Sequence, residues 1–260
     1  MKTVKEFIGQ QRALGRYSFT WNRLRESFNQ SDKALKQALF RLKKKGKIAS
    51  VKSGFYVIIA PEFSKAGMLP ANLFIHELMQ HLNKSYYVGM FSAAALQGAS
   101  HQAIMNYYVV TDHPPVRSIK NKKMTLNFFT KKKWSSQFIL QRKTDAGYIN
   151  ISCPELTVLD LLNYGNFSIN RVATILEELS KTFQTKRLNY VIQDANTASI
   201  QRLGYLIDFL DINPSFKSLI YRELTKRKKF PVALSKTASK KENINTTWKV
   251  VENITVESDL

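Results

Sequence analysis

The feature that most constrains the fold is a basic helix that stops at a glycine and is followed by two short strands around a tight turn. The helix carries an apolar stripe and lysines over most of its remaining surface. The turn contains Gly54, which supplies the positive φ that a tight hairpin needs. A helix followed directly by a hairpin is the second half of a winged helix-turn-helix, so we predict this arrangement near the N-terminus. The parts are a helix over Ser31–Lys45, a stop at Gly46, strands over residues 47–51 and 55–57, and the turn Lys52-Ser53-Gly54.

Two shorter helices precede this stretch and complete a three-helix order. Apolar residues at helical spacing predict the first helix over residues 3–13. Thr20 is a suitable N-cap for a second helix over Trp21–Phe28, and Ser31 for the third, because a side-chain hydroxyl accepts a hydrogen bond from the free backbone N–H groups of the first turn. The apolar positions of the first helix are Val4, Phe7, Ile8 and Leu14.

The third helix is amphipathic, with a basic side opposite its apolar stripe. The stripe consists of Leu35, Ala38, Leu39 and Leu42. We predict that the basic side lies on DNA; the competing interpretation is an ordinary solvated face. Phe40 also points outward, and it either packs under the strand pair or contacts a thymine methyl group. The predicted DNA contacts are Lys33, Lys36, Gln37, Arg41 and Lys44 on the helix, and Lys52 and Ser53 on the hairpin.

Charge supports a polyanionic partner. The net charge is +21, and residues 1–60 hold 14 Lys and Arg against 3 Asp and Glu, a net of +11. Less than a quarter of the chain therefore carries half of the excess, which predicts nucleic acid before acidic lipid.

A second basic concentration covers Arg117–Lys143, with nine basic residues and no acid. It either extends the phosphate-binding surface or lies on the solvent side of a sheet whose edges the lysines protect. The lack of interleaved acids favours phosphate contact. The predicted second contact patch is Lys122, Lys123, Lys131, Lys132 and Lys133, the last three at a hairpin tip.

Beyond Pro61 the pattern predicts a larger mixed α/β domain, with strands first and helices after, so the whole chain is expected to be α+β. We predict a winged-helix domain over residues 1–60, a second domain over 71–234, and a polar tail or terminal strand over 235–260. The expected helices of the second domain are 71–82, 92–100, 154–163, 168–182, 199–210 and 214–226, and its strands are 105–111, 123–129, 136–140 and 148–151.

Residues that suggest catalysis have simpler explanations. His76 and His81 are five positions apart on a predicted helix, whereas a helical zinc pair needs a separation of four. Cys153 has no basic neighbours and fits a small core residue. Glu155 and Asp160 fall in a helix that we expect Ser152 to cap, and capping and packing account for both. We expect no catalytic residue, no metal and no cofactor, and a protein that is not an enzyme.

The chain is also expected to be soluble and cytoplasmic, without a membrane partner. Its first residues lack the apolar core of a signal peptide, and the apolar stretch Tyr86–Leu96 is too short to span a bilayer. The single cysteine excludes a disulfide framework within one chain.

Several stretches together resemble the AbiEi family of antitoxins from bacterial type IV toxin–antitoxin and abortive-infection systems. The resemblance covers about residues 1–230, and its most specific part is Tyr86–Ala99. The stretches are Gly54–Ile58 with Pro61, Tyr86–Ala99 with His101 and Gln102, Pro154–Leu161, and Gln201–Leu206.

The resemblance implies that the winged helix binds inverted repeats in the operon's own promoter and represses it, while the larger domain neutralises a nucleotidyltransferase-like toxin. Lys33, Lys36, Gln37 and Arg41 would then contact the double-stranded operator, and Lys52 would contact phosphate. Tyr86, Ser92, Gly98 and His101 would form a core between the units or a partner surface. Two alternatives remain, which are a transcriptional regulator with a ligand-sensing or dimerising second domain and a DNA-cleaving enzyme.

Overall fold

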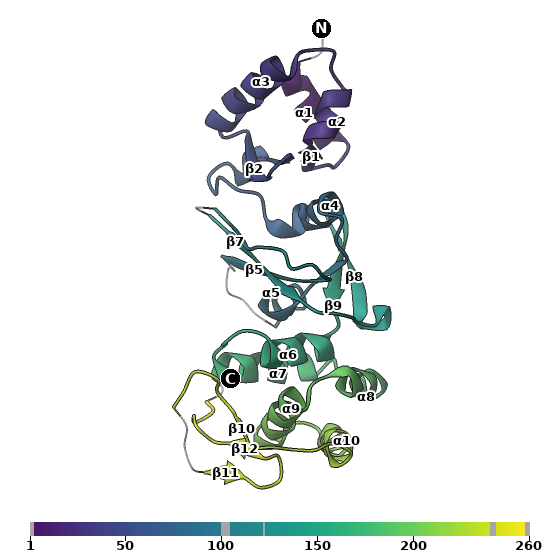
Figure 1. The fold of residues 1–260 in the computed structure, drawn as a ribbon, viewed down its shortest axis with the longest axis vertical. Helices are drawn as coiled ribbons and strands as arrows, with labels where there is room; N and C mark the ends of the chain where they lie inside the picture. The colour runs from purple at the N-terminus through teal and green to yellow at the C-terminus, as the bar shows by residue number, and fades with distance from the viewer. Residues whose placement is uncertain (1–2, 100–104, 122, 240–242, 258–260) are drawn as a thin grey trace. The chain divides into compact units, whose positions relative to one another are not determined.

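The computed structural model describes residues 3–99, 105–121, 123–239 and 243–257, and it is a mixture of α-helices and β-sheets, as expected (Figure 1). The chain divides into two compact units. The first comprises Met1–Tyr87, Met105–Lys132 and Gln141–Ile151, and the second comprises Val88–Ile104, Lys133–Leu140 and Ser152–Leu260. No helix among the described residues is long and apolar enough to cross a membrane.

The N-terminal part of the first unit has three helices and a three-stranded antiparallel sheet in the order β1-β3-β2. The three predicted helices and the hairpin are confirmed. The first strand was not predicted, because three residues are too few to show alternation. The elements are α1 (Val4–Ala13), β1 (Ser18–Thr20), α2 (Trp21–Glu26), α3 (Asp32–Lys44), β2 (Ile48–Lys52) and β3 (Phe55–Ile58).

Both predicted N-caps are present. The Thr20 hydroxyl accepts a hydrogen bond from the backbone N–H of Arg23 (3.2 Å), and the Ser31 hydroxyl accepts one from Ala34 (3.3 Å). Each bond satisfies a backbone N–H that has no partner within its own helix. Helix α2 ends two residues before the predicted Phe28.

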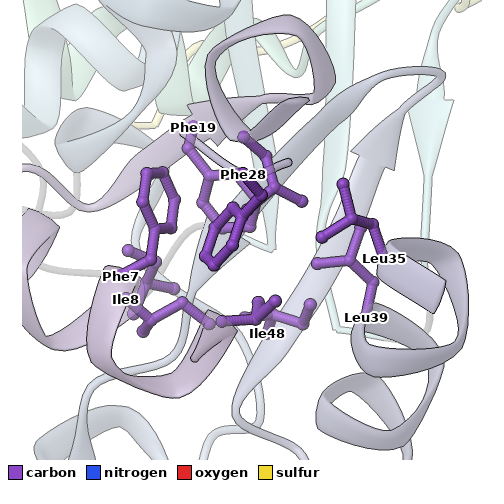
Figure 2. Close-up of a cluster of buried hydrophobic side chains, with 10 residues drawn as sticks. Phe7, Ile8, Phe19, Phe28, Leu35, Leu39 and Ile48 are labelled. Atoms are coloured by element: carbon purple, nitrogen blue, oxygen red, sulfur yellow. The ribbon is translucent and has the colours of Figure 1, made fainter. Parts of the chain in front are cut away.

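An aromatic and aliphatic core joins α3 to the other two helices and to the hairpin (Figure 2). Leu35 and Leu39 are buried in it, whereas Ala38 and Leu42 are only partly buried. The ring of Phe7 meets that of Phe19 edge-on, with the centroids 5.5 Å apart. The predicted inward role of Leu14 is wrong: it lies at the C-cap of α1, where the helix has ended, and it is 65% exposed. The cluster also contains Val4, Ile8, Leu24, Phe28, Ile48 and Ile58.

A six-stranded sheet of order β6-β7-β5-β4-β9-β8 follows. Its strands are β4 (Tyr86–Val88), β5 (Asn106–Thr111), β6 (Ile119–Lys120), β7 (Thr125–Thr130), β8 (Ile139–Thr144) and β9 (Gly147–Ser152). The accompanying helical segments are η1 (Pro61–Phe63), η2 (Ala71–Leu73), α4 (Ile75–His81), α5 (Met90–Leu96) and η3 (Ser136–Phe138).

The strand order corrects the predicted hairpin at Lys131–Lys133. Strand β7 pairs in parallel with β5, while β8 lies beside β9 at the opposite edge of the sheet. Consecutive strands that are not neighbours need a crossing connection. The three lysines therefore begin the connection from β7 to β8 and do not form a hairpin tip.

Five helices follow β9 in the second unit, and four of them were predicted. They are α6 (Pro154–Asn163), α7 (Ile169–Ser180), α8 (Thr185–Asp194), α9 (Thr197–Phe209) and α10 (Pro214–Thr225). Helix α8 was missed, although its buried residues Leu188, Val191 and Ile192 have helical spacing. Cys153, not Ser152, is the N-cap of α6, with Pro154 as the first helical residue.

The chain after α10 is neither a loose tail nor a single strand. It forms a small sheet, β10-β12-β11, from β10 (Val232–Ala233), β11 (Ile244–Asn245) and β12 (Val250–Val251). Trp248, in the loop before β12, is completely buried, and its indole N–H donates to Asp208 of α9 (2.8 Å). The segment is thus part of the packed second unit.

Candidate nucleic-acid interface

Helix α3 presents all five of its predicted DNA contacts to solvent. Lys33, Lys36, Gln37, Arg41 and Lys44 are exposed, while Leu35 and Leu39 anchor the opposite side in the core. Lys36 also lies over the ring of Trp21, with 5.6 Å between its ammonium nitrogen and the ring centroid. This contact restrains the side chain without neutralising its charge.

The exposed face of α3 is free of acid. The only carboxylate of the helix, Asp32, lies in its first turn and is bound by the guanidinium of Arg25 (2.7 Å). None of the ion pairs between described residues involves the four cations of the predicted face. A basic surface without internal neutralisation is suited to phosphate, because each contact releases a counterion from the nucleic acid.

The hairpin turn is tied to its neighbours by two hydrogen bonds. Gly54 has a φ of +71°, and its carbonyl accepts a hydrogen bond from the Trp21 N–H (2.7 Å). The imidazole of His81, on α4, donates through Nε2 to the Ser53 carbonyl (3.0 Å). Lys52 is half-buried and Ser53 is exposed. No local pattern indicates the His81 contact, because it joins residues far apart in the chain.

A hollow of about 310 Å³ lies between the start of α2, helix α3 and the hairpin turn. Lys36 and Ser53 both line it, so two of the predicted contacts from different elements meet there. The remaining lining residues are Thr20, Trp21, Asn22, Gly54, Tyr56 and His81.

The second basic stretch is dispersed over several elements. Lys122 lies outside the described residues. Lys123 is exposed in the turn between β6 and β7, whereas Lys131 is half-buried after β7 and is followed by the exposed Lys132 and Lys133. Lys120 and Lys143 lie on β6 and β8, the two edge strands, where charge discourages strand pairing with another chain. The edge-protection interpretation fits those two residues, and phosphate contact by the other lysines stays a prediction.

The two histidines of α4 are engaged separately. His76 Nδ1 lies 3.1 Å from the Tyr86 hydroxyl, and His76 Nε2 lies 3.0 Å from the amide nitrogen of Gln80. His81 binds the hairpin turn instead. Within the described residues, no three His, Cys, Asp or Glu side chains form a group that could hold a metal ion.

Glu155 serves packing in the second unit. Its carboxylate is fully buried, accepts the Gln184 backbone N–H (2.7 Å), and lies 3.5 Å from the Arg187 guanidinium. It therefore joins the start of α6 to α8. Burial, together with the Glu155 charge, raises the pKa of the Cys153 thiol to about 12, so this thiol stays protonated and inert near neutral pH.

Tyr86 and Ser92, which were expected to form a core between the units or a partner surface, are both buried. Tyr86 is buried in the first unit, and burial raises the pKa of its hydroxyl to about 12. Ser92 is buried in the second unit, so neither side chain offers an exposed partner surface. Gly98 has a φ of +86°, and His101 lies outside the described residues.

The stretch Gln201–Leu206 positions the C-terminal segment, a role that sequence reasoning missed. The side-chain amide of Gln201 donates to the carbonyl oxygens of Phe230, Trp248 and Lys249 at 2.9, 2.9 and 3.1 Å. Arg202 donates through Nε to the Ala233 carbonyl (2.8 Å). Gly204 lies directly against the Trp248 indole.

A family model and a solved structure are similar to this chain. Residues 87–209 match the family model of the AbiEi antitoxin C-terminal domain. The crystal structure of the RV2827C protein from Mycobacterium tuberculosis is similar in fold, with a TM-score of 0.65 and 15% identity over 94% of this chain and 89% of that chain. No curated protein matches the sequence significantly. Residues 87–209 are therefore similar to the AbiEi antitoxin C-terminal domain, a similarity that supports an antitoxin role in a toxin–antitoxin system and implies a toxin partner.

Proposed function

We propose that residues 1–60 form a winged helix-turn-helix domain that binds the promoter of its own operon. Helix α3 enters the major groove of double-stranded operator DNA, and the β2–β3 hairpin acts as the wing on the flanking backbone. The observation that carries the proposal is the acid-free, exposed basic face of α3 on a well-packed core. Gln37 and Ser53 supply neutral hydrogen-bonding groups beside the cations.

The antitoxin activity is assigned to the rest of the chain. The matched domain covers residues 87–209 and includes none of the α3 face. We propose that this domain neutralises a nucleotidyltransferase-like toxin encoded beside it. Lys123, Lys131, Lys132 and Lys133 are proposed as further phosphate contacts. In this scheme repression and neutralisation use different residues and are separable by mutation.

The DNA proposal predicts different outcomes for two single substitutions. Gln37→Ala should relax sequence preference, because an amide side chain reads base edges. The difference in binding free energy between the matched and a mismatched duplex should shrink by about 1–3 kcal/mol. Lys52→Ala should weaken binding to all sequences alike and reduce the salt slope by about 1. Fluorescence anisotropy on the promoter duplex and on a scrambled duplex, over a salt series, measures both effects.

The matched control is Lys186→Ala, which removes an exposed lysine from α8 in the second unit. It should leave both the affinity and the slope unchanged. Equal losses on promoter and scrambled DNA for Gln37→Ala would contradict its assignment as a base-reading residue.

A further inference from the structure

Phe40 is an exposed aromatic side chain on the basic face of α3. Its relative exposure is 67%, so it does not pack under the strand pair, which was one of the two roles its position allowed. It lies in mid-helix between Leu39, which is buried, and Arg41, which is exposed. An exposed phenyl ring does not contribute to folding the free energy that its burial would provide.

The ring lies within the basic face. At about 100° per residue, the neighbouring polar side chains fall within about 60° of it on either side. Lys33 is closest in direction at about 20°, Lys36 and Lys44 are about 40° away on opposite sides, and Gln37 is about 60° away. Lys36, Gln37 and Lys44 each lie about one turn away along the helix, so the exposed ring lies among the groups proposed to hold DNA.

The cations around Phe40 indicate which kind of ligand could cover the ring. An apolar protein groove that received Phe40 would have to desolvate the cations around it without paired acids, which is costly. The DNA major groove offers phosphates for the cations and one apolar group on the base edges, the C5 methyl of thymine. A phenyl ring among lysines therefore matches a thymine edge flanked by backbone phosphates.

We propose that Phe40 is a specificity-determining residue that contacts a thymine methyl group in the operator. The inference rests on the proposed DNA binding by α3 and deepens it, since it names the base group that one side chain reads. The contact adds apolar burial and no charge, so its contribution does not depend on salt concentration.

Replacing thymine by deoxyuridine tests the contact, because it removes only the methyl group and keeps every hydrogen-bonding edge. A preferred duplex is first selected from random DNA with the wild-type chain, and each thymine is then replaced singly. Wild-type protein should bind about fourfold more weakly at one or two positions, the equivalent of about 0.8 kcal/mol for one buried methyl. The other positions should show no change.

The Phe40→Ala variant should bind the thymine duplex with a comparable loss and should no longer respond to deoxyuridine at those positions. Phe40→Leu should keep part of the response, because leucine retains apolar contact. Leu14→Ala is the matched control, since Leu14 is equally exposed (65%) but lies at the end of α1.

The possible failures are distinguishable. If wild-type protein selects no duplex at all, the DNA proposal itself is wrong. If it selects one, but Phe40→Ala keeps the wild-type response to deoxyuridine, the methyl contact is wrong and DNA binding stands. A change in oligomeric state of Phe40→Ala, measured by analytical ultracentrifugation, would assign the ring to a protein interface and overturn the inference.

Discussion

Replacing Lys33, Lys36 and Arg41 together by alanine is expected to weaken promoter binding roughly a hundredfold near 0.15 M salt, because each phosphate contact contributes on the order of 1 kcal/mol. The slope of log affinity against log salt should fall by about 2.7, or about 0.9 for each phosphate released. All three side chains are exposed and lie outside the core, so the fold should persist. Anisotropy titrations over a salt series measure both quantities, and circular dichroism checks the fold.

The charge-matched control is the triple variant Lys186→Ala, Arg222→Ala and Lys228→Ala, which removes three exposed cations from the second unit. It lowers the net charge equally but should retain nearly all of the affinity. If the α3 variant still bound the promoter normally, or if the control lost as much, the assignment of this face would be wrong.

Trp248→Ala is expected to destabilise the second unit by about 3–5 kcal/mol, as truncations of large buried aromatic residues do. The indole is completely buried against Gly204, and its N–H bond to Asp208 would also be lost. Urea unfolding measures the change, and limited proteolysis should show earlier cleavage after α10. Phe230→Ala removes a 61% exposed ring from the same segment and should stay within about 0.5 kcal/mol of wild type.

A substitution at Gly204 tests the same packing contact with Trp248. A Cβ at Gly204 would lie 2.2 Å from the Cζ3 atom of Trp248, so Gly204→Ala should cost about 1–3 kcal/mol through overpacking. In a Trp248→Ala background the clash is gone, and the same substitution should be neutral or stabilise α9 by up to about 1 kcal/mol through helix propensity. If Gly204→Ala changed the unfolding free energy in the same direction in both backgrounds, the Trp248 indole would not be the reason for a glycine at this position.

Local signals in the sequence were sufficient for the N-terminal helices. Ser31 and Thr20 cap the helices as predicted, because capping depends on residues three positions apart. Leu35 and Leu39 are buried as predicted, because helical periodicity determines which side faces the core. The basic face of α3 follows from the same periodicity.

Short strands and long-range contacts were beyond sequence reasoning. Strands β1, β4 and β6 have two or three residues each, too few for a period of two to show. The order of the six-stranded sheet depends on pairing between distant segments. Because β7 and β8 are not neighbours in that order, Lys131–Lys133 lie in a crossing connection and not in the predicted hairpin.

The docking of Trp248 on Gly204 joins residues that are distant in the chain, and nothing near either residue indicates it. The contact of His81 with the hairpin turn is of the same kind. Helical periodicity places Phe40 on the outward side of α3, but whether the ring packs under the strand pair depends on tertiary structure, in which it is 67% exposed.

We propose that one chain represses its promoter through α3 and neutralises a toxin through the rest, and a single co-expression experiment tests both activities. Wild-type protein and the Lys33/Lys36/Arg41 alanine variant are each expressed with the adjacent toxin gene, in cells that carry a reporter under the operon's promoter. Both proteins should rescue growth, and only wild type should silence the reporter. Failure of wild type to rescue growth, or silencing by the variant, would contradict the account.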